Sequence, residues 1–167
     1  MTGHVPPPPE PTPFTHLDAA GHARMVDVTG KDPSVREATA SGFVRCPERV
    51  VELLAADAVP KGDVLAVARV AGIAAAKRVP DLLPLAHVIG VHGVVVDAVV
   101  VEGGVEVRAT VRTADRTGVE MEALTAVSVA SLAVVDMVKG IDKGVVIEQI
   151  RLESKAGGRS GDWHRPA

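Results

Sequence analysis

Aromatic residues and cysteines are scarce in this chain of 167 residues, which has two Phe, one Trp, no Tyr and one Cys. The single thiol, Cys46, excludes an intrachain disulfide, and the lack of a Cys pair argues against a structural zinc site. With so few aromatic rings, the chain lacks the stacking platforms on which many RNA-binding proteins hold bases. The formal net charge of −3 also lacks the basic excess of a nucleic-acid-binding domain. We therefore expect no nucleic acid partner.

The chain also lacks a long hydrophobic segment. Residues 1–15 contain no apolar core of a secretory signal, and the uncharged run 123–135 is shorter than the ~20 residues that span a bilayer. We therefore expect a cytoplasmic protein without membrane contact. Prolines crowd the N-terminus and predict a disordered tail over residues 1–13, followed by a single domain over residues 14–167.

What the chain has in abundance is small apolar residues, mostly Val and Ala, within a hydrophobic fraction of 47%. Periodicity and turn residues predict strands over 23–29, 35–45, 91–101, 105–113 and 145–153, and helices over 48–58, 62–78 and 118–139. From residue 35 onward the order is β, α(α), β, β, α, β, which is the split βαβ or ferredoxin-like arrangement. We therefore predict an α+β fold, with an antiparallel sheet and helices packed on one face.

The stretch 117–139 is the most informative part of the sequence. Its uncharged middle is flanked by acids, Glu122 at one end and Asp136 at the other. Helical geometry places these two within about 40° of each other around the axis but roughly 20 Å apart along it. One small-molecule site cannot easily span that distance. Either there are two sites, or neighbouring subunits bring opposite ends of this helix together.

Other charged groups on this stretch have structural explanations that compete with functional ones. Thr117-Gly-Val-Glu120 fits a capping box, in which Glu120 bonds the backbone N–H of Thr117, whereas Glu122 has no such role. Asp136 and Lys139 stand at i,i+3 and would form an ordinary surface ion pair. The apolar run before them instead favours a covered pair with shifted pKa values, which is typical of functional sites.

Further candidates come from loops. Lys61 precedes a predicted helix and either shares a bound phosphate with the first backbone N–H groups or is an exposed loop lysine. His87 has a pKa suited to proton transfer or phosphate contact, or is a surface residue. Lys155 and Arg159 lie in a glycine-rich segment that either closes over an anionic ligand or forms a flexible terminus. Arg36 is either another cation of such a site or a solvated surface side chain. The phosphate-binding P-loop pattern is absent.

Together these segments resemble the cyclic pyranopterin monophosphate synthase family, also called the molybdenum cofactor biosynthesis protein C family. The resemblance runs from about residue 15 to residue 162 and rests on motifs that occur in order: Met25-Val-Asp-Val28, Val35-Arg-Glu-Ala38, Lys61-Gly-Asp-Val64, Leu83-Pro-Leu-Ala-His87, Thr117-Gly-Val-Glu-Met-Glu-Ala-Leu-Thr-Ala126, Asp136-Met-Val-Lys139 and Lys155-Ala-Gly-Gly158. It implies conversion of 3′,8-cyclo-7,8-dihydro-GTP to cyclic pyranopterin monophosphate with release of diphosphate. It also implies a hexamer, built as a trimer of dimers, with sites at subunit interfaces.

The resemblance also implies roles for residues. Asp136 corresponds to the catalytic acid/base, and Lys61 and Lys139 correspond to catalytic lysines. The implied substrate-contacting and supporting pocket residues are Leu85, Ala86, His87, Met121, Glu122, Glu120, Arg36, Asp27 and Lys155. Where the family reads Leu-Cys-His-Pro, this chain has Leu85-Ala86-His87-Val88, which implies that a cysteine is not a required nucleophile here.

The implied substrate sets requirements that these residues can meet. A triphosphate needs several cations, and Lys61, Lys139, Lys155 and Arg36 can supply them. The rearrangement requires no redox cofactor, and we expect no protein-bound metal, although Mg²⁺ could accompany the triphosphate.

Two rival functions fit the same topology. One is a non-catalytic ferredoxin-like module that binds a small regulator at a dimer interface, in which no reaction would depend on Lys61 or Asp136. The other is an RNA-binding module, which the net charge and the lack of aromatics on the strands disfavour.

Overall fold

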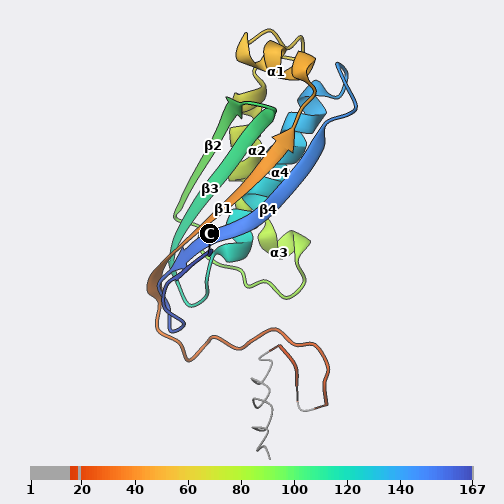
Figure 1. The fold of residues 1–167 in the computed structure, drawn as a ribbon. Coiled ribbons are helices and arrows are strands. Elements are labelled where there is room, and N and C mark those ends of the chain that lie inside the picture. Colours follow the sequence, from red (N-terminus) through yellow and green to blue (C-terminus); the bar gives the residue numbers. More distant parts are fainter. Residues whose placement is uncertain (1–15, 19, 167) are drawn as a thin grey trace, which may run out of the picture.

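An antiparallel sheet organises the fold, in the order β2-β3-β1-β4-β5 (Figure 1). The computed structural model describes residues 16–18 and 20–166, so the predicted tail over residues 1–13 lies outside the described part. The strands are β1 (Ser34–Arg45), β2 (Gly93–Val101), β3 (Gly104–Asp115), β4 (Val146–Ala156) and β5 (Trp163–His164). The helices are α1 (Glu48–Ala55), α2 (Val64–Ala76), α3 (Val79–Leu82) and α4 (Glu120–Val138).

The predicted ferredoxin-like α+β arrangement is confirmed by this topology. The helices α2 and α4 lie side by side on one face of the sheet, and α1 lies at one end of it (Figure 1). The strand β1 is central, paired antiparallel with β3 on one side and β4 on the other. The loops that precede β1 and α4 therefore meet at the end of the sheet opposite α1.

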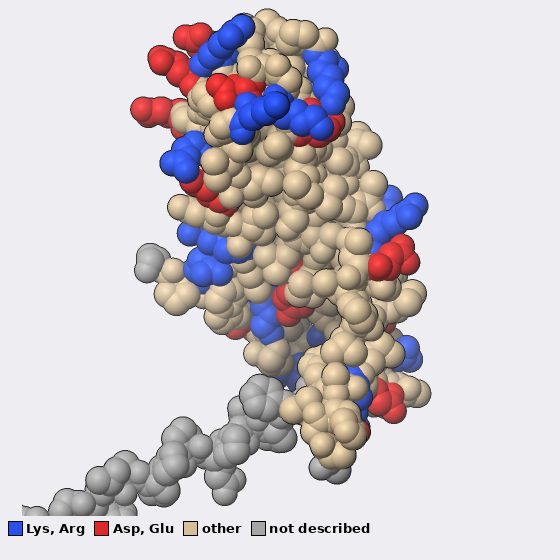
Figure 2. Space-filling view, turned by 90° about the vertical axis from the view of Figure 1, so that its right-hand side faces the viewer, with Lys and Arg blue, Asp and Glu red and all other residues tan. Residues whose placement is uncertain are grey.

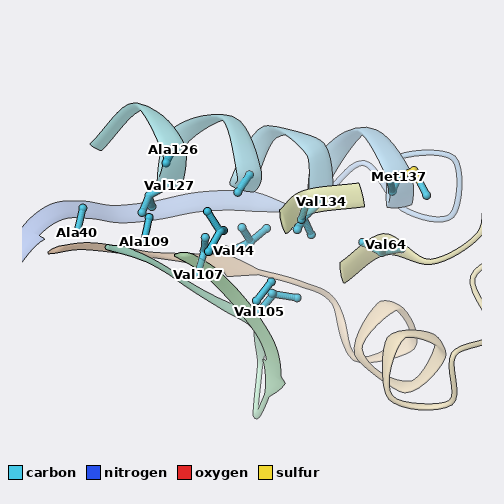
Figure 3. Close-up of a cluster of buried hydrophobic side chains, with 14 of the residues drawn as sticks. Ala40, Val44, Val64, Val105, Val107, Ala109, Ala126, Val127, Val134 and Met137 are labelled. Atoms are coloured by element: carbon cyan, nitrogen blue, oxygen red, sulfur yellow. The ribbon is translucent and has the colours of Figure 1, made fainter. Parts of the chain in front are cut away.

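The core lies between the sheet and α4. Alternate residues of β1 face the helices, and Ala40 and Val44 are fully buried there. From α4, Val127 and Val134 point into the same layer (Figure 3). Because these side chains are small, sheet and helices approach closely.

The contact between α2 and α4 is closer still, because a glycine lies in it. A Cβ on Gly72 would come 2.9 Å from the carbonyl oxygen of Ala126 and 3.2 Å from the Cβ of Ala130. A side chain at this position would force the helices apart. Because Gly72 has no side chain, α2 packs closely against α4 and holds it at a fixed position on the sheet.

By length and composition, α4 is apolar enough to cross a membrane, but it is a helix of the fold's core. Half of its most apolar window is buried against the sheet and α2. The outward side carries a row with helical spacing, Met121, Thr125, Ser128 and Leu132, that contains no charge and ends at Asp136. Figure 2 shows a broad uncharged expanse across the middle of one face of the molecule, with charged side chains at the top, along both edges and towards the lower end.

One predicted strand is wrong. Residues 23–29 form no strand and contribute one isolated bridge, between Leu17 and Ala23. The Asp27 carboxylate accepts the backbone N–H of Thr29 at 2.8 Å, and the turn that this bond forms ends the extended run. The carbonyl of Val26 bonds a side chain instead of a neighbouring strand.

The predicted capping box is also wrong. The helix α4 begins at Glu120, with Val119 as its N-cap residue and no side-chain capping bond. Glu120 is therefore the first helical residue instead of the third, which a capping box requires. Its carboxylate turns back over Gly118, where a Cβ would overlap with Oε2 of Glu120. Glu120 is thus left at the edge of a cavity.

Candidate active site

A cavity of about 300 Å³ opens at the N-terminal end of α4. Its walls come from the segment before β1, the loop after α3 and the first turn of α4. The lining residues are His16, Val26, Val28, Lys31, Leu85, Ala86, His87, Thr117, Gly118, Glu120, Met121 and Glu122. Six of the residues implied by the family resemblance therefore lie together: Leu85, Ala86, His87, Glu120, Met121 and Glu122. The volume is at the lower end of the range for small-molecule sites.

Glu122 is the unusual group in this cavity. It is 4% exposed, and among the described residues it is the only Asp, Glu, Lys or Arg that is buried. Burial raises the pKa of its carboxyl group, and the neighbouring charge of Glu120 raises it further. A buried carboxyl group that lines a cavity can donate a hydrogen bond to a polar edge of a ligand when it is protonated, or accept one from it when it is ionised.

His87 is fixed by the backbone of the segment before β1. Its Nε2 lies 2.6 Å from the carbonyl oxygen of Val26, and since a carbonyl only accepts, Nε2 carries the hydrogen. In the neutral ring Nδ1 is then left as an acceptor. This bond ties the loop after α3 to residues 23–29, two walls of the same cavity.

Three other predicted residues do not line this cavity. The Asp27 carboxylate is engaged by the N–H of Thr29, which lowers its pKa. Arg36, at the start of β1, donates from Nε to the carbonyl of Asp115 at 3.0 Å. Lys155, near the end of β4, donates to the hydroxyl of Ser160.

The three predicted catalytic residues form a separate cluster at the C-terminal end of α4. The Asp136 carboxylate lies between two ammonium groups: Lys139 bonds Oδ1 at 2.7 Å and Lys61 bonds Oδ2. Lys61 also donates to the backbone carbonyl of Asp136 at 3.0 Å. Bonds from Lys139 and then from Lys61 lower the pKa of Asp136 to about 2. At neutral pH the carboxylate is ionised, so the acidic hydrogens of this cluster belong to the ammonium groups.

One expectation about this cluster is wrong in the single chain. Asp136 is not covered, because 53% of its side chain is exposed. The phosphate contact of Lys61 at the start of α2 stays a prediction, and the Asp63 carboxylate caps that helix by accepting the N–H of Ala66 at 2.9 Å. The ammonium group of Lys61 turns instead towards α4.

The structure thus places the predicted residues at the two ends of one helix. Glu122 and Asp136 are fourteen positions apart in α4, which corresponds to about 20 Å along the axis. Within one chain the cluster of Asp136, Lys61 and Lys139 and the cavity of Glu122 and His87 are therefore separate.

Sequence reasoning missed some residues of the cavity, among them His16, Lys31 and Thr117. Lys31 is the most informative, because it stands between Asp27 and Arg36, two residues that the resemblance already implied. A lysine in that interval was a usable signal. The folding of residues 23–33 across the end of the sheet, which places its side chain at the cavity, was not readable from local pattern.

Fold and site together define an α+β protein of ferredoxin-like topology with a small-molecule cavity at one end of a core helix and a carboxylate held between two lysines at the other. The MoaC family model matches residues 25–158. The chain is similar to proteins named cyclic pyranopterin monophosphate synthase from Streptomyces avermitilis, 61% identical over 98% of this chain and 96% of that protein, and from Streptomyces coelicolor, 64% identical over 91% and 89%. A protein of Mycobacterium bovis named cyclic pyranopterin monophosphate synthase 2 is 53% identical over 91% of both chains. This chain belongs to the MoaC family.

These similarities extend over nearly the whole chain, including both groups of residues on α4. They do not support the non-catalytic regulatory module that the topology alone left open. The predicted resemblance is confirmed.

Proposed function

We propose that this chain is a cyclic pyranopterin monophosphate synthase of molybdenum cofactor biosynthesis, a lyase-type enzyme that converts (8S)-3′,8-cyclo-7,8-dihydroguanosine 5′-triphosphate to cyclic pyranopterin monophosphate and diphosphate. The observation that carries the proposal is the set of full-length relatives with that name, at 53–64% identity. The geometry supports it as well, since the chain offers a cavity for a ring system and, elsewhere, a group of proton donors.

The two groups of residues suit different parts of this chemistry. Rebuilding a purine-derived ring into a pterin needs proton donors and acceptors. The ammonium groups of Lys61 and Lys139 supply donors, and the Asp136 carboxylate holds them close together. Glu122 and His87 line the cavity where a polar ring edge binds. We assign catalysis to the first group and substrate binding to the second.

The separation of the two groups requires a second subunit if they act on one substrate. We propose that each site is completed by another copy of the chain, in a homohexamer built as a trimer of dimers. The uncharged outward row of α4 supports this assembly, because Leu132 is 57% exposed and Met121 is 43% exposed. Exposed apolar residues in an uncharged row are typical of a subunit contact.

The row also suggests how the copies meet. Most symmetric dimers have a two-fold axis that places the same surface on both partners. If the axis passes near Ser128, at the middle of the row from Met121 to Asp136, the α4 helices run antiparallel. The Asp136 end of one helix then lies beside the Met121 end of the other. Each pair of helices forms two equivalent sites, one at each end.

Supplying the purified protein with the cyclised GTP derivative tests the activity. We expect release of diphosphate and, after oxidation, a fluorescent pterin, with both products lost in Lys61→Ala. A well-folded oligomer that yields neither product from authentic substrate would contradict the proposed function.

We propose further that the reaction uses no protein-bound cofactor and takes place in the cytoplasm, with Mg²⁺ entering only with the triphosphate. Turnover after dialysis against EDTA, with and without added Mg²⁺, measures that contribution. Loss of activity that Mg²⁺ does not restore, but another metal does, would contradict it.

A further inference from the structure

The cavity at the N-terminal end of α4 is built from segments that are far apart in the chain. Its walls come from within residues 23–33 before β1, the loop 83–92 after α3 and the first turn of α4. Inside the cavity, the bond of His87 to the carbonyl of Val26 joins the first two walls. The three segments keep their relative positions only if further bonds hold them from outside.

Asp115, the last residue of β3, holds the loop 83–92. Its half-buried carboxylate accepts two backbone N–H groups, that of Arg116 at 2.7 Å through Oδ1 and that of Gly90 at 3.1 Å through Oδ2. The bond from Arg116 and then the bond from Gly90 lower the pKa of Asp115, so the carboxylate is ionised at neutral pH and both bonds are charge-assisted. Because Gly90 follows His87 by three residues, Asp115 sets the position of the histidine relative to β3.

Arg116, the next residue, holds the segment before β1. Its Nε donates to the backbone carbonyl of Lys31 at 2.8 Å, and Lys31 lines the cavity. The residue after Arg116 is Thr117, which also lines the cavity and leads directly into α4. The position of the segment before β1 is therefore tied to the start of α4.

Asp115 and Arg116 thus connect all three walls, although neither side chain lines the cavity. Their own backbone is fixed in turn, because the Arg36 guanidinium donates to the carbonyl of Asp115 at 3.0 Å and to that of Arg116 at 3.2 Å. In the described part of the chain neither side chain forms an ion pair. Both direct their hydrogen bonds to backbone groups instead.

We propose that Asp115 and Arg116 are positioning residues of the active site, which act through the backbone of its walls and do not touch the substrate. They hold the loop of His87 and the turn of Glu122 at the separation that the substrate requires. This inference rests on the proposed function for the reaction. A displacement of about 1 Å at a binding group can lower a rate by about a hundredfold, so bonds of this kind affect turnover as well as folding.

The variants Asp115→Ala and Arg116→Ala, made in the full-length oligomer, test the proposal. Each should lower kcat/KM for the cyclised GTP derivative roughly tenfold or more, because the walls of the cavity shift. Hydrogen exchange gives a readout that needs no turnover. Exchange should become faster in residues 83–92 in Asp115→Ala and in residues 23–33 in Arg116→Ala.

Two further variants separate positioning from general stability. Arg116→Lys should recover most of the activity, since an ammonium group can also donate to the carbonyl of Lys31. Arg69→Ala is the matched control, because Arg69 on α2 donates to the carbonyl of Ala98 in β2 at 3.1 Å and does not line the cavity. It removes the same kind of bond and should leave kcat/KM close to that of wild type, even where the unfolding temperature falls.

The deciding measurement repeats the two alanine variants in a His87→Ala background. If Asp115 and Arg116 act by placing His87, their removal should cost much less activity there than in wild type. A loss of equal size in both backgrounds, or variants as active as wild type, would overturn the proposal. If Asp115→Ala does not fold, Arg116→Ala and Arg116→Lys decide it by the same comparison. Failure of the proposed function is a different result, in which wild type itself makes no pyranopterin.

Discussion

At the scale of single residues, the most informative group is Glu122, because its position is unfavourable for folding. A buried carboxyl group with a raised pKa is less stable in the folded chain than in water whenever it is ionised. The folded state therefore binds a proton more tightly at this residue than the unfolded state does, and stability falls as pH rises through the titration of Glu122. A residue with this cost is better explained by ligand binding than by folding.

We predict that Glu122→Gln is more stable and less active than wild type. The unfolding temperature should rise at pH 7, and the gain should shrink as pH falls and the wild-type carboxyl group becomes protonated. The value of kcat/KM should fall roughly tenfold to a hundredfold, since a charged hydrogen-bonding group is lost from the cavity. Thermal unfolding at several pH values and steady-state kinetics measure both effects.

Glu52→Gln is the control for this prediction, because Glu52 is an exposed glutamate on α1. It should change neither the unfolding temperature at pH 7 nor the activity appreciably. A Glu122→Gln protein that is less stable than wild type at pH 7 would contradict the account of a buried, unfavourable carboxylate.

The contribution of Asp136 to folding stability depends on pH in the opposite direction to that of Glu122. Its pKa is lowered to about 2 by the bonds from Lys139 and Lys61, so the stabilising charge is present at neutral pH and is lost as pH falls from about 4, its ordinary range, towards 2. We predict that Asp136→Asn is less stable than wild type at pH 7 and that the difference disappears by pH about 2. Acid titration of both proteins, followed by circular dichroism, checks this. A difference that stays constant through that range would show that the two lysine bonds do not stabilise the fold.

At the scale of elements, the sequence predicted those whose periodicity is strong. The strands β1 to β4 and the helices α1, α2 and α4 were expected, with boundaries that moved by a few residues. Two expectations failed where a single side chain decides the conformation: the turn at Asp27, and the start of α4 at Glu120, whose carboxylate lies over Gly118. Local sequence pattern reflects secondary-structure propensity, whereas the turn at Asp27 depends on one hydrogen bond and the start of α4 depends on one close contact. The short β5 has too few residues to give a pattern at all.

The candidate site was only partly readable for a related reason. Asp136 and Lys139 are neighbours in one helical turn, so their pairing follows from spacing, and the structure confirms it. The bond of Lys61 to Asp136 links positions far apart in the chain, and the place of Lys31 at the cavity depends on how residues 23–33 cross the end of the sheet. Contacts between positions so far apart in the chain become known only once the fold is known.

The contact of α2 with α4 gives a prediction at this scale. Gly72→Ala should lower the free energy of unfolding by about 1 kcal/mol, because the overlap with Ala126 and Ala130 outweighs the better helix propensity of alanine. Gly140→Ala is the matched control, since a Cβ there meets open space, and its stability should be unchanged or slightly higher. Chemical denaturation measures both. Stabilisation by Gly72→Ala would contradict the close helix contact.

At the scale of the whole molecule, the separation of Glu122 from Asp136 along α4 leads to the central claim, that one active site uses both ends of this helix from two copies of the chain. We propose that the uncharged outward row between them is the surface on which the copies meet. In this account α4 has two roles, since its inner side fills the core and its outer side joins subunits.

The most direct test mixes subunits that are inactivated at opposite ends of α4. Equal amounts of Glu122→Gln and Lys61→Ala chains, carrying different tags, are exchanged, and mixed oligomers are isolated through both tags. In a randomly exchanged hexamer one shared site in four combines an intact Glu122 with an intact Lys61, so the mixed oligomers should show about a quarter of wild-type activity. Mixing Lys61→Ala with Asp136→Ala, which lie at the same end, should restore none. If isolated hybrids of Glu122→Gln and Lys61→Ala stay as inactive as their parents, the shared site is contradicted.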